Sequence, residues 1–135
     1  MTNPQNTLVW RWLAAGDASN FDAFDDLLHP DAVIHAPLGL STTSADAEKA
    51  VWGQALASIP DLRHQVQEVV VNSEVEMARV VVTGTMLRGF SGVAGTGRSF
   101  HFDQAVITHL QEGRIVEAWE IADIGALREQ VDEGG

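Results

Sequence analysis

Residues 97–130 read GRSFHFDQAVITHLQEGRIVEAWEIADIGALREQ, and this stretch decides the fold. Two runs rich in apolar residues flank the short connection Gln111-Glu112-Gly113. A three-residue connection that ends in glycine is typical of a type I turn closed by a left-handed residue. The stretch therefore predicts an antiparallel hairpin followed by a short closing helix.

The length of the turn sets the expected register of this hairpin. If residues 111–113 form the loop, Leu110 faces Arg114, and Gln104 faces Glu120 further along. Because side chains alternate with period two, Gln104 and Glu120 then share one face. The same face carries Phe102, Val106, Thr108, Val116, Ala118 and Ala122. The opposite face carries Ile107, Ile115, Trp119 and Ile121 and is apolar as well.

Glu120 is the unusual residue of the hairpin. A carboxylate among apolar side chains costs several kcal/mol unless it is hydrogen-bonded, neutralised or opened to a water-filled pocket. The small side chains of Ala118 and Ala122 leave room beside it, which indicates the wall of a cavity. The alternative is an edge strand with Glu120 in solvent.

Composition predicts one domain that spans residues 1–135 and has a substantial core. No apolar run approaches membrane-spanning length, and the N-terminus lacks the pattern of a secretory signal. With no cysteine the chain has no disulfides or cysteine-metal sites, which agrees with a reducing compartment. We therefore expect a cytoplasmic protein.

The charge of the chain argues against polyanionic partners. The formal net charge is -11, and the 8 basic residues are scattered, whereas nucleic acids and anionic membranes require a positive surface. Gly92, Gly95 and Gly97 lie between two strand-like runs and do not open a helix, so they do not form a phosphate-binding loop. We expect no nucleic acid, membrane, metal or organic cofactor.

Periodicity predicts helices first and strands afterwards. The expected helices cover residues 4–16, 19–29, 44–58 and 124–131, and the expected strands cover residues 32–36, 64–71, 78–87, 100–110 and 114–122. This order predicts an α+β fold, in which a curved antiparallel sheet wraps around the N-terminal helices as a cone. The space between sheet and helices is an internal cavity for an apolar ligand.

Four segments carry a resemblance to a known family. They are LLHPDAVIH (27–35), IPDLR (59–63), GTGR (95–98) and EGRIVEAWE (112–120), the last leading to Asp123. In this order the chain resembles the nuclear-transport-factor-two-like cone fold, and within it the SnoaL-like polyketide cyclases. The resemblance covers essentially the whole chain.

The resemblance implies a cofactor-independent reaction. In the characterised cyclases an acidic residue on the last strand is the general acid/base of an intramolecular aldol ring closure. Glu120 matches that position, where those cyclases carry Asp, and Gln104 matches a glutamine on the preceding strand. The cyclases often have a histidine two residues before the acid, whereas this chain has Ala118.

Other candidate residues have two interpretations each. His35 resembles a position that lines the family pocket, and the alternative is a structural histidine. Asp123 is a catalytic candidate or the N-cap of the last helix. Five further residues are expected to line the cavity or to belong to the core: Trp12, Trp52, Phe102, Val106 and Ala118. Asp17 and its acidic neighbours suggest a solvated surface.

These observations favour an enzyme that acts on an apolar, carbonyl-bearing small molecule, with Glu120 as acid or base. Related isomerase, dehydratase (lyase) and epoxide-opening reactions are alternatives, and so is a ligand-binding module without chemistry. We also expect a homodimer, because one layer of helices cannot cover both faces of an apolar sheet.

Overall fold

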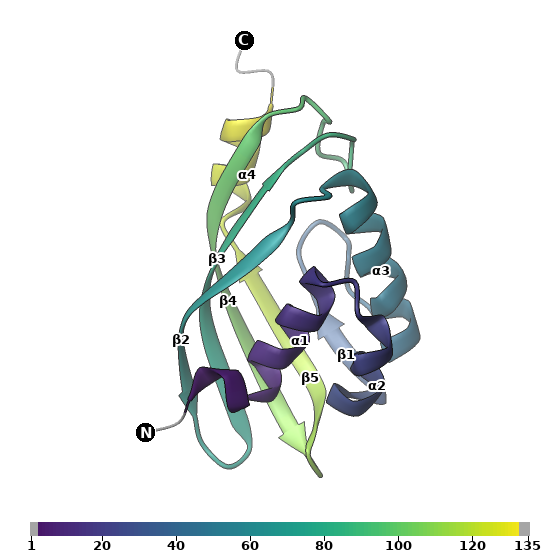
Figure 1. Cartoon of the computed structure of the whole chain (residues 1–135), viewed down its shortest axis with the longest axis vertical. Helices are drawn as coiled ribbons and strands as arrows, with labels where there is room; N and C mark the ends of the chain where they lie inside the picture. Colours follow the sequence, from purple (N-terminus) through teal and green to yellow (C-terminus); the bar gives the residue numbers. More distant parts are fainter. Residues whose placement is uncertain (1–2, 133–135) are drawn as a thin grey trace.

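The chain has two helices, a strand, a third helix, four further strands and a closing helix, as Figure 1 shows for the computed structural model, which describes residues 3–132. The helices are α1 (Leu8–Asp17), α2 (Phe24–Leu27), α3 (Ala45–Ser58) and α4 (Ile124–Val131), with single 3-10 turns at Pro4–Asn6 and Phe21–Ala23. The strands are β1 (Leu28–His35), β2 (Arg63–Val71), β3 (Val75–Thr85), β4 (Ser99–Gln111) and β5 (Arg114–Ala122).

The start of α1 is fixed to the sheet by a buried carboxylate. Thr7 caps the helix by accepting the Trp10 N–H, as a threonine at an N-cap does. The Glu76 carboxylate of β3 accepts the Val9 N–H at 2.9 Å, where a negative charge is favoured by the helix dipole. The Val9 N–H has no partner within the helix, and its bond to Glu76 holds the start of α1 against the sheet.

The five strands form one open sheet in the order β1-β5-β4-β3-β2. The pairs formed by β2, β3, β4 and β5 are antiparallel, as the sequence predicts, whereas β1 pairs with β5 in parallel. A parallel pair needs a long connection, and α3 with three strands supplies it. The α+β prediction is confirmed, and the sheet is mixed.

The predicted register of the last hairpin is wrong by two residues. Glu112 and Gly113 both have positive φ (52° and 78°), so the turn has two residues, and Gln111 faces Arg114. A bulge at residue 116 then adds one residue to β5. Gln104 therefore faces Ala122, and Glu120 faces Val106. Because the total shift is even, Gln104 and Glu120 still share the inner face.

The bulge also moves Ile115 from the predicted outer face to the core. Ile115 pairs with Leu110 beside the turn and is fully buried. Beyond the bulge the predicted alternation returns, with Ala118 buried and Ile121 exposed. The physical reason is that one extra residue on one strand reverses the faces on its two sides.

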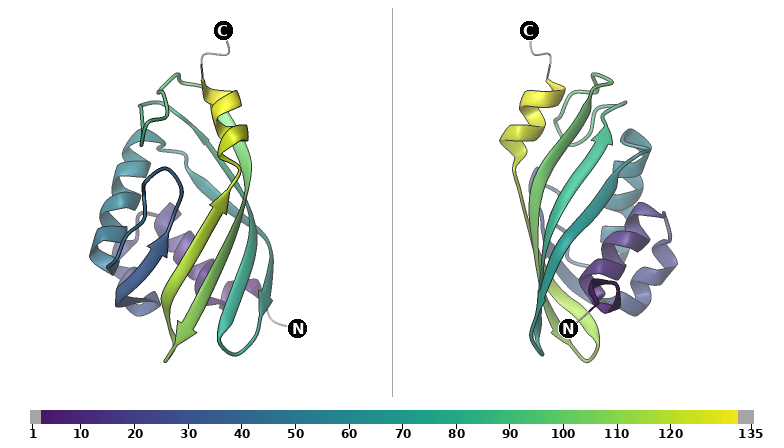
Figure 2. Two further views of the ribbon diagram at one scale, coloured as in Figure 1. Left: turned by 180° about the vertical axis from the view of Figure 1, so that it is seen from behind. Right: turned by 60° about the vertical axis from the view of Figure 1, so that its left-hand side comes forward.

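The inner face of the sheet is covered by α1, α2 and α3, while α4 lies apart from them near the C-terminal end, as both views in Figure 2 show. The core lies between these layers. Its largest fully buried side chains are Trp12, Phe24, Leu13, Leu28, Ile34, Met86 and Ile115. The sequence prediction of helices packed on one face of a curved sheet is confirmed.

Gly16 is a point of close approach between α1 and α3. A Cβ atom at this position would lie 2.5 Å from the Trp52 ring. A Cβ at Gly53, on α3, would meet nothing closer than Phe21 at 3.9 Å. A glycine-to-alanine substitution can therefore be compared at two helix positions, one where the new Cβ would clash with the Trp52 ring and one where it has room.

We expect Gly16→Ala and Gly53→Ala to have opposite effects on stability. Alanine in a helix is favoured over glycine by about 1 kcal/mol, so Gly53→Ala should stabilise the protein by up to that amount. Gly16→Ala should destabilise it by about 1–3 kcal/mol, because the rigid Trp52 ring must move in a packed core. Urea unfolding of both variants measures the difference. A stabilised Gly16→Ala protein would show that the ring is loosely held.

The outer face of the sheet keeps several apolar side chains in solvent. Val70 of β2, Met77 of β3 and Ile121 of β5 are 62%, 43% and 60% exposed. Polar groups interrupt this face, including the exposed Glu68–Arg79 ion pair. Among residues 3–132, no helix lies over the middle of these strands (Figure 2).

The sheet-to-sheet homodimer stays a prediction. If the outer face is the interface, sedimentation at micromolar concentration should give twice the 14.6 kDa mass of the chain. Ile121→Glu would place a charge in that interface and should shift the protein to a monomer. A wild-type protein that sediments as a monomer would contradict the prediction.

Candidate functional site

A cavity lies between α3 and the part of the sheet where β4 begins and β5 ends. Solvent can occupy about 120 Å³ of it, and the empty space up to its open mouth is about 830 Å³. Its walls are mainly apolar, with Met86 from the end of β3, Phe100 and Phe102 from β4, and Leu127 from α4. Glu48, His64, Gln104 and Glu120 are the polar exceptions considered below.

Glu120 lines this cavity from β5, as the sequence predicts. Among the described residues no side chain or backbone group forms a hydrogen bond or ion pair with its carboxyl group. Burial, followed by the negative charge of Glu48, raises the pKa of Glu120 to about 8. Glu120 is therefore a largely neutral carboxylic acid at pH 7, able to donate a proton.

Gln104 lines the same cavity from β4. It is 92% buried, and its Oε1 atom has no hydrogen-bond partner within residues 3–132. A buried amide oxygen without a partner costs about 1–3 kcal/mol. The expected hydrogen bond between Gln104 and Glu120 is not formed in the described structure, because the observed register separates the two along their strands.

Glu48 is a second buried carboxylate on the cavity wall, and it comes from α3. It is only 3% exposed. The Thr42 hydroxyl donates to its Oε1 at 2.9 Å, and the Trp52 indole N–H donates to its Oε2 at 3.0 Å. Both partners donate, and a carboxylate accepts, so this arrangement favours the ionised form of Glu48.

The two carboxyl groups have different environments in one cavity. Burial raises the pKa of Glu48 as well, but the hydrogen bonds from Thr42 and Trp52 act against this rise. Glu120 has no such donors. Two like charges in one low-dielectric site favour a single shared proton, and it resides on the carboxyl group with fewer donors. We therefore assign the negative charge to Glu48 and the proton to Glu120.

His64 reaches the cavity from β2 and is fixed by Asp17 at the end of α1. The His64 backbone N–H donates to Asp17 Oδ2 at 2.6 Å, and His64 Nδ1 lies 2.7 Å from Asp17 Oδ1. The imidazole also packs against the Trp52 ring at 5.0 Å. Asp17 is therefore a structural partner of His64, which corrects the expectation of a solvated surface.

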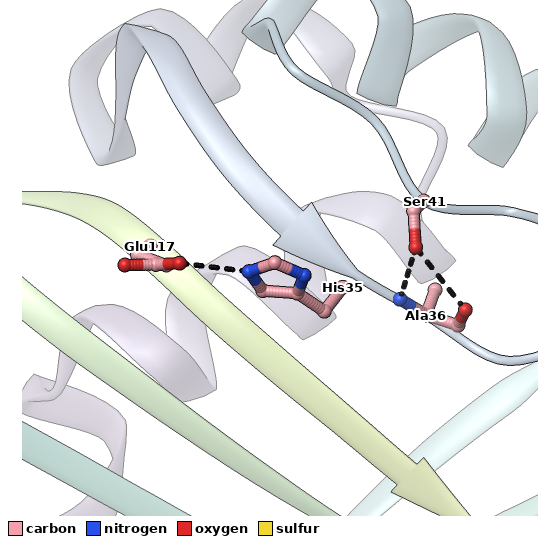
Figure 3. A network of polar contacts seen from close by, with 4 residues as sticks. All are labelled: His35, Ala36, Ser41 and Glu117. Carbon is pink, nitrogen blue, oxygen red and sulfur yellow. Dashed lines mark hydrogen bonds and ion pairs between the residues drawn. The ribbon is translucent and has the colours of Figure 1, made fainter.

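His35 does not lie in the cavity, which corrects its expected place in the site. It pairs with Trp119 in the parallel register, while its neighbour Ile34 points into the core. Its Nε2 lies 2.7 Å from Glu117 Oε2, and its ring stacks on Trp119, as a residue on the outer face must. Figure 3 shows the His35 ring reaching across to Glu117 on β5, beside the Ser41 hydroxyl that bonds to Ala36.

The remaining predicted residues divide between the cavity and the core. Trp52 and Phe102 line the cavity. Trp12, Val106 and Ala118 are fully buried in the core and do not line the cavity, which is the second of the two places that the sequence allowed. Asp123 is likewise absent from the lining. It accepts the Ala126 N–H at 3.0 Å and is the N-cap of α4, the alternative that the sequence allowed.

Sequence reasoning missed Glu48 and the His64–Asp17 pair, although each left a signal. Glu48 occupies the apolar stripe of α3 between Ala45 and Trp52, where a carboxylate is out of place. His64 alternates with Val66 on the inner side of β2, so strand periodicity points it inward. A search for charged residues at core positions would have found both.

Among residues 3–132, no three His, Asp or Glu side chains cluster in a way that could hold a metal ion. None of the described helices has the length and apolar character needed to span a membrane.

The fold and the site together define an α+β cone protein with a partly buried acid in an apolar cavity. Residues 7–131 match the sequence model of the SnoaL-like polyketide cyclases. The chain therefore belongs to the SnoaL-like polyketide cyclase family, which confirms the resemblance. No functionally curated protein has significant sequence similarity to it.

Solved structures show the same fold. IdmH from Streptomyces antibioticus, a candidate polyketide cyclase, is 28% identical, with a TM-score of 0.77 over 93% of this chain and 95% of IdmH. TsrD from Streptomyces laurentii is 21% identical, with a TM-score of 0.84 over 96% and 95%. AclR from Streptomyces galilaeus, a candidate hydroxylase, is 24% identical, with a TM-score of 0.74 over 90% and 76%.

The raised pKa of Glu120 predicts that the protein loses stability as the pH rises. The unfolded chain releases this proton near the ordinary pKa of 4.5, whereas the folded protein holds it to about pH 8. Between these values the folded state binds more protons, so the free energy of unfolding should fall by roughly 2–4 kcal/mol from pH 5 to pH 8.

Glu120→Gln should remove most of this dependence. Urea unfolding of both proteins at several pH values in this range measures the two slopes. Glu129→Gln, a change at an exposed position of α4, is the control and should keep the wild-type slope. Equal slopes for wild type and Glu120→Gln would show that Glu120 titrates as a solvated carboxylate.

Proposed function

We propose that this protein is a cofactor-independent enzyme that acts by general acid/base catalysis on an apolar, carbonyl-bearing small molecule. Ring closure of the aldol type on a polyketide-like substrate is the reaction that the family suggests. The observation that carries the proposal is the Glu120 carboxyl group lining an apolar cavity without a hydrogen-bond partner among the described residues, with the unpartnered Gln104 Oε1 on the same wall. Burial, followed by the charge of Glu48, raises the pKa of Glu120 to about 8 and favours its acid form.

Glu120 supplies the proton at the carbonyl oxygen. When a ketone loses an α-proton, or when a carbon nucleophile adds to a carbonyl group, negative charge develops on the carbonyl oxygen, and a carboxylic acid beside it can transfer a proton as the charge forms. A pKa near the working pH makes this transfer efficient in both directions. The negative charge of Glu48 raises the pKa of Glu120 and so favours its protonated form before the reaction.

Gln104 positions the substrate. Its amide carries two N–H donors and one acceptor oxygen, and within residues 3–132 that oxygen has no partner. A substrate carbonyl that accepts from the amide N–H groups would be held on the same face of the sheet as Glu120, and the oxygen would remain open to a donor of the ligand.

The shape of the cavity limits the substrate. The part that solvent can occupy, about 120 Å³, suits one or two rings, and the open mouth leaves room for a longer remainder. The apolar side chains favour a ligand without charges near the acid. A ketone with one or two fused rings is therefore the class of probe to test first.

Two other functions use parts of the same geometry. Epoxide opening has support from the Glu48 and Glu120 pair, although no arginine lines the cavity within the described residues, and Arg114 lies exposed at the hairpin turn. A ligand-binding module without chemistry would use the cavity alone. Exchange of the α-protons of a bound ketone distinguishes a ligand-binding module from an enzyme.

The test is α-proton exchange of 2-tetralone, an apolar two-ring ketone, in D₂O. We expect the wild-type protein to accelerate exchange, measured by proton NMR. Glu120→Gln keeps the size of the side chain and deletes its exchangeable acid, so the rate should fall by about 10²–10⁴. Gln104→Ala should lower the rate by about tenfold, the value of one hydrogen bond.

Binding of 2-tetralone is followed in the same samples by thermal shift. Retained binding with lost exchange in Glu120→Gln supports the catalytic assignment. Binding without exchange by the wild-type protein would favour the binding module. Glu129→Gln serves again as the control and should match the wild type in both measurements.

A further inference from the structure

We propose that His64, held by Asp17, is a second catalytic residue of this cavity and removes the α-proton of the substrate as a general base. Glu120 then serves the carbonyl oxygen, so the two halves of proton transfer belong to different residues. The inference rests on the proposed function, because it concerns the same cavity and the same class of carbonyl substrate.

Asp17 fixes both the position and the tautomer of His64. One carboxylate oxygen accepts the His64 backbone N–H at 2.6 Å, and the other lies 2.7 Å from Nδ1. Because an ionised carboxylate only accepts hydrogen bonds, Nδ1 carries the ring proton in this contact. In the neutral imidazole, Nε2 is then the unprotonated nitrogen, with a lone pair available to a substrate.

The second ring nitrogen has no partner in the protein. Among residues 3–132 Nε2 forms no hydrogen bond, and it is not among the unpartnered buried side-chain atoms, which are Trp12 Nε1 and Gln104 Oε1. His64 lines the cavity, whereas Asp17 lies outside its lining and borders a second hollow that His64 also reaches. Because Nδ1 is directed at Asp17, the opposite edge of the ring, which holds Nε2, is the edge that a ligand in the cavity would meet.

Trp52 contacts both sides of the proposed machinery. Its ring lies 5.0 Å from the His64 imidazole, and its indole N–H donates to Glu48, whose charge acts on Glu120. His64 on β2 and Glu120 on β5 both project from the inner face of the sheet and line the same cavity, with β3 and β4 between their strands. A substrate that lies along this face would have the base toward β2 and the acid toward β5.

The proposed step is balanced without a further reactant. The α-carbon–hydrogen bond breaks and its proton passes to His64 Nε2, while Glu120 gives its proton to the carbonyl oxygen of the same ketone, so that the electron pair of the broken bond forms the enol. The enol carbon then attacks a second carbonyl of the same molecule. The new alkoxide takes the proton from His64, and the first carbonyl oxygen returns its proton to Glu120, which restores both residues.

The experiment uses the full chain and α-proton exchange of 2-tetralone in D₂O. His64→Gln should lower the exchange rate by about 10² or more, while thermal shift shows that 2-tetralone still binds. His101→Gln is the matched control, because His101 is exposed on the outer face and bonds to Gln130 only through its backbone. Its rate should equal that of the wild type.

Asp17→Asn is a second variant that tests the tautomer. The new side-chain oxygen would accept the His64 backbone N–H, and the new amide N–H would donate to Nδ1, which moves the ring proton to Nε2. We expect at least a tenfold loss of exchange with binding retained, and ¹⁵N NMR should show the changed tautomer. Glu117→Gln makes the same chemical change beside His35 on the outer face and should leave exchange unchanged.

The outcomes separate this inference from the proposed function. Exchange that is lost in Glu120→Gln and unchanged in His64→Gln overturns the inference alone. Exchange that is lost in His64→Gln and unchanged in Glu120→Gln overturns the role of Glu120 and supports His64. A wild-type protein whose His64 carries its proton on Nε2 overturns the inference, and absence of any wild-type exchange overturns both.

Discussion

The indole of Trp52 is the contact on which the site depends. Its N–H donates to the buried Glu48 carboxylate, and its ring packs against His64, Phe24 and the backbone of Gly16. The first and third helices can approach closely only because residue 16 has no Cβ. This single side chain therefore fixes the distance between helices and sheet, and with it the width of the cavity.

Much of the fold follows from alternation and turn chemistry, and its errors come from local backbone geometry. The two-residue turn at Glu112 and Gly113 and the bulge after Ile115 each add one residue to the register. Hydrophobic periodicity reveals neither the turn nor the bulge, because both depend on local backbone φ angles that many different sequences can adopt. Gln104 and Glu120 were still placed on one face, since an even shift preserves the side of the sheet.

The sequence predicted only those site residues whose orientation follows from strand alternation within one hairpin. Gln104 and Glu120 follow from one hairpin, so local reasoning finds them. Glu48 and His64 come from a helix and an edge strand whose packing depends on tertiary contacts with Thr42, Trp52 and Asp17. His35 was misplaced for the same reason: the parallel pairing of β1 with β5 decides which way it points, and the sequence does not reveal that pairing.

Two carboxyl groups in one apolar cavity, Glu48 fully buried and Glu120 partly buried, reduce the stability of the folded protein. Replacement of either by a packed apolar residue would remove the desolvation penalty and the repulsion between them. Glu48 recovers part of this cost through two hydrogen bonds, whereas Glu120 recovers none from the described residues. Glu120 can avoid most of the penalty only by keeping its proton, and a carboxylic acid that keeps its proton at neutral pH is chemically useful as a donor. Desolvation of Glu120 and its repulsion by Glu48 thus lower the stability of the fold and, at the same time, keep Glu120 in the acid form that can donate a proton.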